Sequence, residues 1–170
     1  FVRAHRDRGV LTCAKHFPGH GSARGDTHLG LVDVTATWHE RELRPFHRLI
    51  EAGLCDAIMS AHVFNAALDP AHPATLSRAV ITGLLRERLR FDGVISSDDL
   101  EMRAISSRYG LENSVPLALE AGLDLLCFGN NLTYDPDIVP RVIAILERAV
   151  TAGRLSEARI DASYRRVLAL

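Results

Sequence analysis

The sequence predicts an α/β fold of the (β/α)8 TIM-barrel class, of which the chain supplies about four βα units plus terminal helices. Short apolar runs alternate with helical patterns four times, which indicates parallel strands joined by right-handed crossovers. Reactive side chains follow these runs on one side only, as in sites built at the carboxyl ends of strands. Four units make half a barrel, so we expect the carboxyl-terminal half of a longer chain, or a truncated copy.

The strands are predicted from apolar runs that end at turn-forming residues. They cover residues 10–16, 56–63, 93–98 and 123–128. No helix is predicted before the first strand. All of residues 1–170 are expected to form one partial catalytic barrel domain.

The helices are predicted where apolar positions recur at helical spacing between a capping residue and a glycine. They cover residues 37–52, 77–90, 115–121, 137–152 and 156–169. Thr37 is the expected N-cap of the first of these, with Glu40 completing a capping box. Ser77 and Ser156 are the expected caps of two others.

Composition excludes several classes of function. The chain is 47% apolar, with 20 basic and 21 acidic residues and a net charge of -1, so it is globular and shows no basic footprint for nucleic acid. No apolar run approaches the roughly 18 residues of a membrane span. Cys13, Cys55 and Cys127 are expected to be buried free thiols, which favours the cytoplasm; secretion stays open because the true amino terminus is not fixed.

The loop after the first strand carries the densest chemistry. Residues 15–28 read Lys-His-Phe-Pro-Gly-His-Gly-Ser-Ala-Arg-Gly-Asp-Thr-His. Asp26 lies two residues before His28, so its carboxylate can bond one ring nitrogen and raise the basicity of the other. Such a pair can act as a general acid and base near neutral pH.

Asp98 ends the third predicted strand, and Asp99 follows it directly. Either carboxylate could simply cap the next helix. A nucleophilic carboxylate that faces an acid/base group is instead the arrangement of a retaining glycosidase. Lys15 and His16 could then hold sugar hydroxyl groups as hydrogen-bond donors.

Three stretches together resemble glycoside hydrolase family 3, in its β-N-acetylglucosaminidase (β-hexosaminidase) branch. They are Lys-His-Phe-Pro-Gly-His-Gly at 15–21, Asp-Thr-His at 26–28 and Phe-Asp-Gly-Val-Ile-Ser-Ser-Asp-Asp-Leu at 91–100. The likeness runs over nearly the whole chain. It implies a retaining exo-β-N-acetylglucosaminidase that acts on peptidoglycan or chitin fragments, without a metal or organic cofactor.

The resemblance also implies a role for each matching residue. Asp98 would be the nucleophile, His28 the acid/base and Asp26 its orienting partner, while Lys15 and His16 would bind the sugar. The family's substrate-binding arginine and aspartate on earlier strands have no counterpart in these residues. The expected partner is a carbohydrate containing N-acetylglucosamine.

Several alternatives stay open. His62, on the second predicted strand, is a substrate-binding candidate, although it could equally be a packed core histidine. His20 and Arg24 could be solvated loop residues. The spacing of the three loop histidines does not favour zinc. For the whole protein, another family 3 β-glycosidase, an N-acetylglucosaminide phosphorylase and an inactive sugar-binding fragment remain alternatives.

Overall fold

A four-stranded parallel sheet forms the centre of the computed structural model, which describes residues 1–131 and 134–170. The strands are β1 (Cys13–Phe17), β3 (Ala57–Ser60), β5 (Val94–Asp99) and β6 (Leu125–Cys127). Their order in the sheet is β1-β3-β5-β6, so strands that follow one another along the chain are neighbours and every pair is parallel. The four predicted strands and the parallel arrangement are confirmed.

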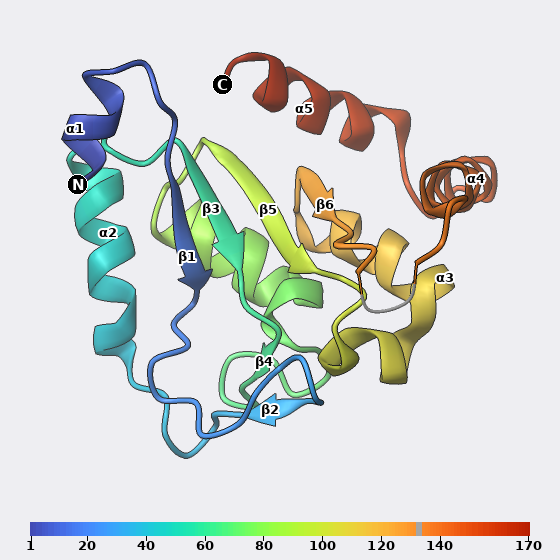
Figure 1. Ribbon diagram of the computed structural model, residues 1–170, viewed down its shortest axis with the longest axis horizontal. Coiled ribbons are helices and arrows are strands. Elements are labelled where there is room, and N and C mark those ends of the chain that lie inside the picture. Colours follow the sequence, from blue (N-terminus) through green and yellow to red (C-terminus); the bar gives the residue numbers. More distant parts are fainter. Residues whose placement is uncertain (132–133) are drawn as a thin grey trace.

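A second, two-stranded parallel sheet lies beyond the carboxyl ends of the main strands. It pairs β2 (Val32–Asp33) with β4 (Val63–Phe64), as Figure 1 shows at the lower edge of the molecule. The predicted strand over 56–63 is therefore divided between β3 and β4. Strands of two residues are too short for a periodic pattern, which is why the sequence did not reveal β2.

The amino-terminal half differs from the prediction at two helices. A short helix, α1 (Val2–Arg6), precedes β1, where none was expected; Arg6 binds Asp56, at the amino end of β3. The predicted helix over 37–52 is a 3-10 turn, η1 (Glu40–Leu43), followed by α2 (Arg44–Glu51). Its capping box is formed by His39 and Glu42 rather than by Thr37 and Glu40.

The remaining helices match the prediction more closely. They are η2 (Ala74–Leu76), the π-helical η3 (Ala79–Arg88), α3 (Arg103–Ala121), α4 (Ile138–Thr151) and α5 (Glu157–Leu168). Only the second half of α3 was predicted, because Gly110 interrupts its helical backbone and the preceding turns are polar. Ser156 caps α5 as expected, accepting a hydrogen bond from the Arg159 amide at 3.2 Å.

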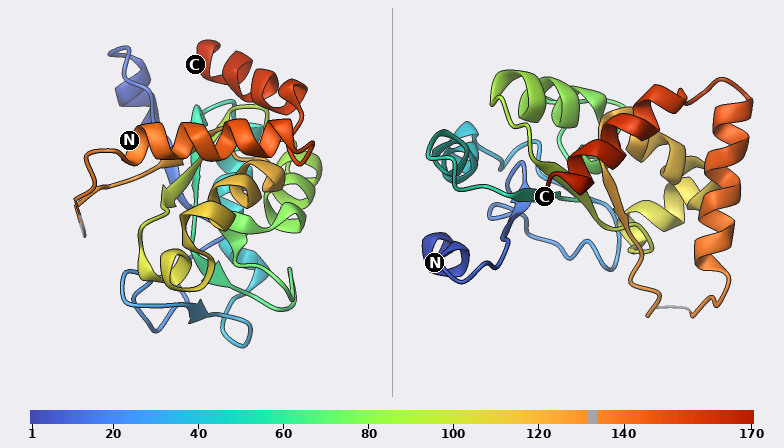
Figure 2. Two further views of the ribbon diagram at one scale, coloured as in Figure 1. Left: turned by 90° about the vertical axis from the view of Figure 1, so that its right-hand side faces the viewer. Right: turned by 90° about the horizontal axis from the view of Figure 1, so that it is seen from above.

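Helices α2, η3 and α3 lie on the same side of the sheet (Figures 1 and 2). The core between these layers is apolar. Its fully buried members include Phe17, Ile58, Ile81, Leu85, Ile95 and Ile105. The strands all run toward the end of the sheet where β2 and β4 lie, so the loops that follow them gather at this carboxyl end (Figure 1).

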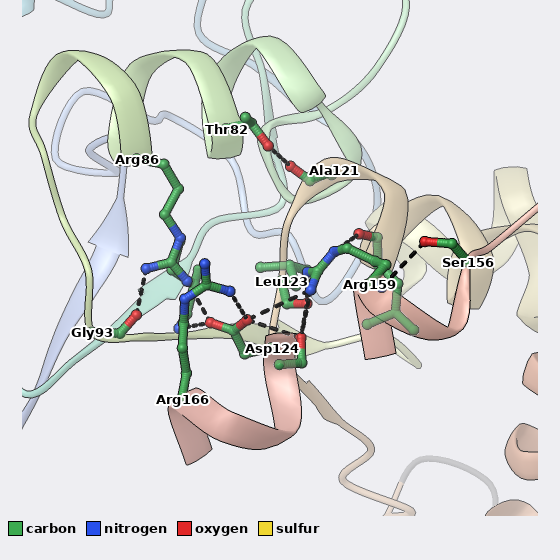
Figure 3. Close-up of polar contacts among 12 residues, drawn as sticks. Thr82, Arg86, Gly93, Ala121, Leu123, Asp124, Ser156, Arg159 and Arg166 are labelled. Atoms are coloured by element: carbon green, nitrogen blue, oxygen red, sulfur yellow. Dashed lines mark hydrogen bonds and ion pairs between the residues drawn. The ribbon is translucent and has the colours of Figure 1, made fainter. Parts of the chain in front are cut away.

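The amino end of β6 carries a buried ionic cluster, shown in Figure 3. The carboxylate of Asp124 is inaccessible to solvent and is bound by the guanidinium groups of Arg86 and Arg166, by the Ser163 hydroxyl and by the Ile95 amide. These groups come from η3, α5 and β5. The cluster therefore ties the carboxyl-terminal helix to the sheet.

All three cysteines are free thiols, as predicted, but their burial differs from the prediction. Cys13 is exposed because β1 is an edge strand, while Cys55 and Cys127 are half-buried. Burial raises the pKa of Cys55 to about 12. Within the described residues, no helix combines the length and apolar character needed to cross a lipid bilayer.

Candidate active site

Strand β1 presents Lys15 and His16 at its carboxyl end. The strand alternates in burial, so Lys15 is exposed, His16 is half-buried and Phe17 is fully buried. The Phe17 ring packs edge-on against Phe46 of α2, with ring centroids 5.2 Å apart. This contact fixes the end of the strand and therefore the position of the two polar side chains before it.

Asp98 of β5 faces His16 across the neighbouring strand β3. Its Oδ2 lies 3.6 Å from His16 Nε2, and its Oδ1 accepts a hydrogen bond from the Asp99 amide at 2.9 Å. Asp99, not Asp98, makes the turn that follows, because Asp99 Oδ1 accepts from the Glu101 amide at 2.9 Å. Among the residues that the structure describes, Asp98 is thus a half-buried carboxylate with unused acceptor capacity.

The surroundings of His16 favour its neutral form. Burial lowers the pKa of His16, and the nearby charges of Lys15 and His20 lower it further, while the Asp98 carboxylate opposes the shift. The distance of 3.6 Å to Asp98 is too long for a hydrogen bond. A neutral imidazole beside a free carboxylate can exchange hydrogen bonds with a sugar hydroxyl group.

Asp26 and His28 form the pair that the sequence predicted. Asp26 Oδ1 accepts from the His28 amide at 2.9 Å and lies 2.7 Å from His28 Nδ1. The backbone hydrogen bond, followed by the ring hydrogen bond, lowers the pKa of Asp26. The Asp26 and His28 side chains are 56% and 65% exposed, and no residue within 1–131 or 134–170 binds Nε2 of His28.

The loop that carries this pair is attached to the start of α3. Thr27 is buried, and its carbonyl accepts a hydrogen bond from the Ala104 amide at 3.2 Å. The His28 carbonyl accepts from the Arg103 amide at 3.4 Å. Because α3 closely follows Asp98 in the chain, these contacts bring the loop after β1 to the carboxyl end of β5 (Figure 1).

His62 is a core residue, so its prediction as a substrate-binding residue is wrong. The side chain has no solvent exposure. Its Nδ1 lies 2.8 Å from the Thr75 hydroxyl, and its Nε2 lies 2.8 Å from the Asp99 carbonyl oxygen, to which it donates. Both ring nitrogens are therefore occupied, and burial lowers the pKa of His62.

Two residues that the sequence analysis did not assign to the site support the Pro18–Gly21 part of the loop. Trp38 Nε1 donates to the Pro18 carbonyl at 3.0 Å. Glu42 Oε2 accepts from the Gly21 amide at 3.2 Å, and its side chain fills the space beside Gly19. No periodic pattern could have revealed either contact, because both join residues about twenty positions apart.

The described residues bring together no group of three His, Cys, Asp or Glu side chains in a geometry suited to a metal ion. The His20 ring is tilted by 59° relative to that of His16, with ring centroids 5.9 Å apart. His16 and Asp98 thus meet at the ends of β1 and β5, and Lys15 precedes His16 in the chain. Asp26 and His28 lie in a loop that binds the start of α3 at the same end of the sheet. The arrangement is a carboxylate beside an imidazole at the strand ends, with a carboxylate–imidazole pair on a loop at the same end of the sheet.

The model of the glycosyl hydrolase family 3 N-terminal domain matches residues 1–170. The chain belongs to glycosyl hydrolase family 3. This membership confirms the resemblance found in the sequence, and it confirms the prediction of a TIM-barrel-like fold of which this chain forms part.

Curated relatives within family 3 carry the name beta-hexosaminidase. The protein of Tolumonas auensis is 42% identical over 134 residues, which are 77% of this chain and 40% of the relative. That of Hydrogenovibrio crunogenus is 36% identical over 162 residues, 94% of this chain and 43% of the relative. The chain therefore spans about two fifths of the length of these relatives.

Solved structures of family 3 enzymes share the fold. A glycoside hydrolase family 3 beta-N-acetylglucosaminidase from Paenibacillus sp. is 44% identical, with a TM-score of 0.90 over 99% of this chain and 32% of that chain. The beta-N-acetylglucosaminidase from Thermotoga maritima is 35% identical, with a TM-score of 0.83 over 98% of this chain and 36% of that chain.

Proposed function

We propose that the protein is a retaining exo-β-N-acetylglucosaminidase that removes terminal β-linked N-acetylhexosamine from peptidoglycan or chitin fragments. The observation that carries this proposal is the half-buried carboxylate of Asp98, which keeps free acceptor capacity beside His16. The names of the relatives and of the solved family 3 enzymes support the choice of sugar. The three free thiols support action in the cytoplasm.

In the first step Asp98 attacks the anomeric carbon of the bound sugar. The bond from that carbon to the glycosidic oxygen breaks, and His28 Nε2 gives its proton to the departing oxygen. The Asp26 carboxylate, 2.7 Å from Nδ1, supports the protonated imidazole before this transfer. The product of the step is a glycosyl-aspartate and a free alcohol.

In the second step His28, now neutral, takes a proton from a water molecule. The water oxygen attacks the anomeric carbon and the bond to the Asp98 oxygen breaks, which restores the carboxylate. Two successive inversions retain the anomeric configuration. Lys15 and His16 bind sugar hydroxyl groups in both steps and hold the anomeric carbon in line with Asp98.

The acid role of His28 is tested by the leaving group. In the natural protein, His28→Ala is expected to lower kcat/KM on the N-acetylglucosamine disaccharide by about 10²–10⁴-fold, the usual contribution of general acid catalysis. A nitrophenyl glycoside, whose phenolate leaves without protonation, is expected to lose less than about tenfold in its first step. Equal losses on both substrates would remove His28 from the acid role.

The same assay with and without inorganic phosphate distinguishes the alternative reactions. Free N-acetylglucosamine as the product under both conditions supports hydrolysis, and a sugar phosphate identifies a phosphorylase. Turnover of the glucoside instead of the N-acetylglucosaminide would identify another β-glycosidase. Calorimetric binding of N-acetylglucosamine without turnover would identify a sugar-binding protein.

A further inference from the structure

An exposed leucine directly follows the proposed acid/base residue. Leu29 is 75% exposed, and the side chain of Leu31 is also partly exposed. The two flank Gly30, around which a methyl group would meet no atom within 4 Å. The loop thus presents apolar surface to open space at the carboxyl end of the sheet.

The backbone holds Leu29 in this exposed position. Its amide donates to the Asp26 carbonyl at 3.1 Å, which closes a turn around Thr27 and His28. Thr27 is buried beneath the turn, and the start of α3 binds the carbonyls of Thr27 and His28. Apolar surface kept in water by a fixed turn gains free energy when a ligand covers it.

The proposed role of His28 as general acid indicates which part of the substrate lies near Leu29. A general acid must be within hydrogen-bond reach of the atom that it protonates, which for His28 is the oxygen that joins sugar and aglycone. Asp26 occupies Nδ1, so Nε2 is the transferring atom. Leu29 follows His28 directly, with Cα atoms about 3.8 Å apart, so it is the next residue along the chain from the point where the aglycone begins.

We propose that Leu29 is a specificity-determining residue that contacts the aglycone through the apolar C–H face of a second pyranose ring. This inference rests on the proposed function, and it identifies Leu29 as a residue of the same site that contacts the leaving group. Because the aglycone departs in the first step, the contact contributes to formation of the glycosyl-aspartate and not to its hydrolysis.

The test compares two leaving groups in the natural protein. One substrate is the β-linked disaccharide of N-acetylglucosamine, and the other is β-N-acetylglucosaminyl fluoride, whose leaving group has no C–H surface. Leu29→Ala is expected to lower kcat/KM about tenfold on the disaccharide and less than about twofold on the fluoride. Leu29→Met, which restores apolar volume, is expected to recover most of the loss.

Leu168→Ala is the matched control, since Leu168 is 68% exposed on α5, far from the loop in Figure 1. It is expected to leave both substrates unchanged. Equal effects of Leu29→Ala on the two substrates, or no effect on the disaccharide, would overturn the inference and leave the proposed function standing. If the unaltered protein turned over neither substrate, the proposed function itself would fail and this inference with it.

Discussion

The two ends of the main sheet each hold an aspartate, and the two carboxylates differ in what they bind. Asp124, at the amino end of β6, is inaccessible to solvent and is bound by two guanidinium groups, a hydroxyl and an amide. Asp98, at the carboxyl end of β5, is half-buried and accepts one backbone hydrogen bond. The acceptor positions of the aspartate are filled at the amino end of the sheet and partly free at the carboxyl end.

This difference separates stability from chemistry. A carboxylate whose acceptor positions are all filled by the protein can hold elements together, but it has nothing left for a substrate. A carboxylate with free acceptor positions receives little stabilisation from the fold, and it can attack a substrate as a nucleophile. The division matches the general behaviour of barrels, whose amino face serves stability and whose carboxyl face carries the site.

The largest expected effect comes from the open end. Asp98→Asn removes the proposed nucleophile, and kcat is expected to fall by about 10⁴-fold or more, as for other covalent nucleophiles. The free energy of unfolding in urea is expected to change by less than about 1 kcal/mol, because a single backbone hydrogen bond is affected. A large loss of stability with activity retained would contradict the comparison.

At the amino end of the sheet, where the Asp124 carboxylate is fully bonded, a substitution is expected to lower stability. Asp124→Asn leaves Arg86 and Arg166 without their carboxylate, and removing one partner of a buried ion pair costs about 3–5 kcal/mol. Urea denaturation measures this loss. Arg165→Gln, on the same helix, breaks only the exposed pair with Asp161 and is expected to cost less than about 1 kcal/mol. Equal stability of Asp124→Asn and the unaltered protein would refute the structural role.

The smallest effect concerns the titration of the loop. The His28 amide and ring lower the pKa of Asp26, so Asp26 is expected to titrate below the ordinary aspartate range in carbon-detected NMR. Because the folded-state pKa is depressed, the interaction is present above the ordinary pKa and is lost as the pH falls through the depressed value. His28→Ala keeps the backbone hydrogen bond and should reverse only part of the shift. Titration of Asp26 in the ordinary range would contradict the geometry.

The sequence predicted the parts of the fold that repeat. Apolar runs located β1, β3, β5 and β6, and the Ser156 cap located the start of α5. The shortest elements were missed or merged. Strand β2 has two residues and was not predicted, β4 was merged with β3 into one predicted strand, and the five residues of α1 are too few for a periodic pattern. A local rule favoured Thr37 as a cap, but the chain uses His39, and Glu42 binds both the His39 amide and the loop after β1.

The sequence predicted that Asp98 and His16 lie at the carboxyl end of the sheet, but it did not predict the surroundings of each candidate residue. The sequence placed Asp98 and Asp99 together and left open which of them makes the turn; the hydrogen bond to Glu101 assigns it to Asp99. It also could not exclude His62 from the site, because the sequence pattern around a histidine at a strand end is the same whether its ring is buried or exposed. Burial and hydrogen-bond partners are tertiary properties.

The contact between Glu42 and the glycines of the loop has a consequence for how this protein can vary. A Cβ atom at Gly19 would come within 2.6 Å of the Glu42 side chain, and its φ of +123° already disfavours other residues. Any larger residue at position 19 would displace the Glu42 carboxylate, which accepts a hydrogen bond from the Gly21 amide. A larger residue at position 19 therefore requires a change at position 42 as well, so libraries that redesign this loop should randomise both positions.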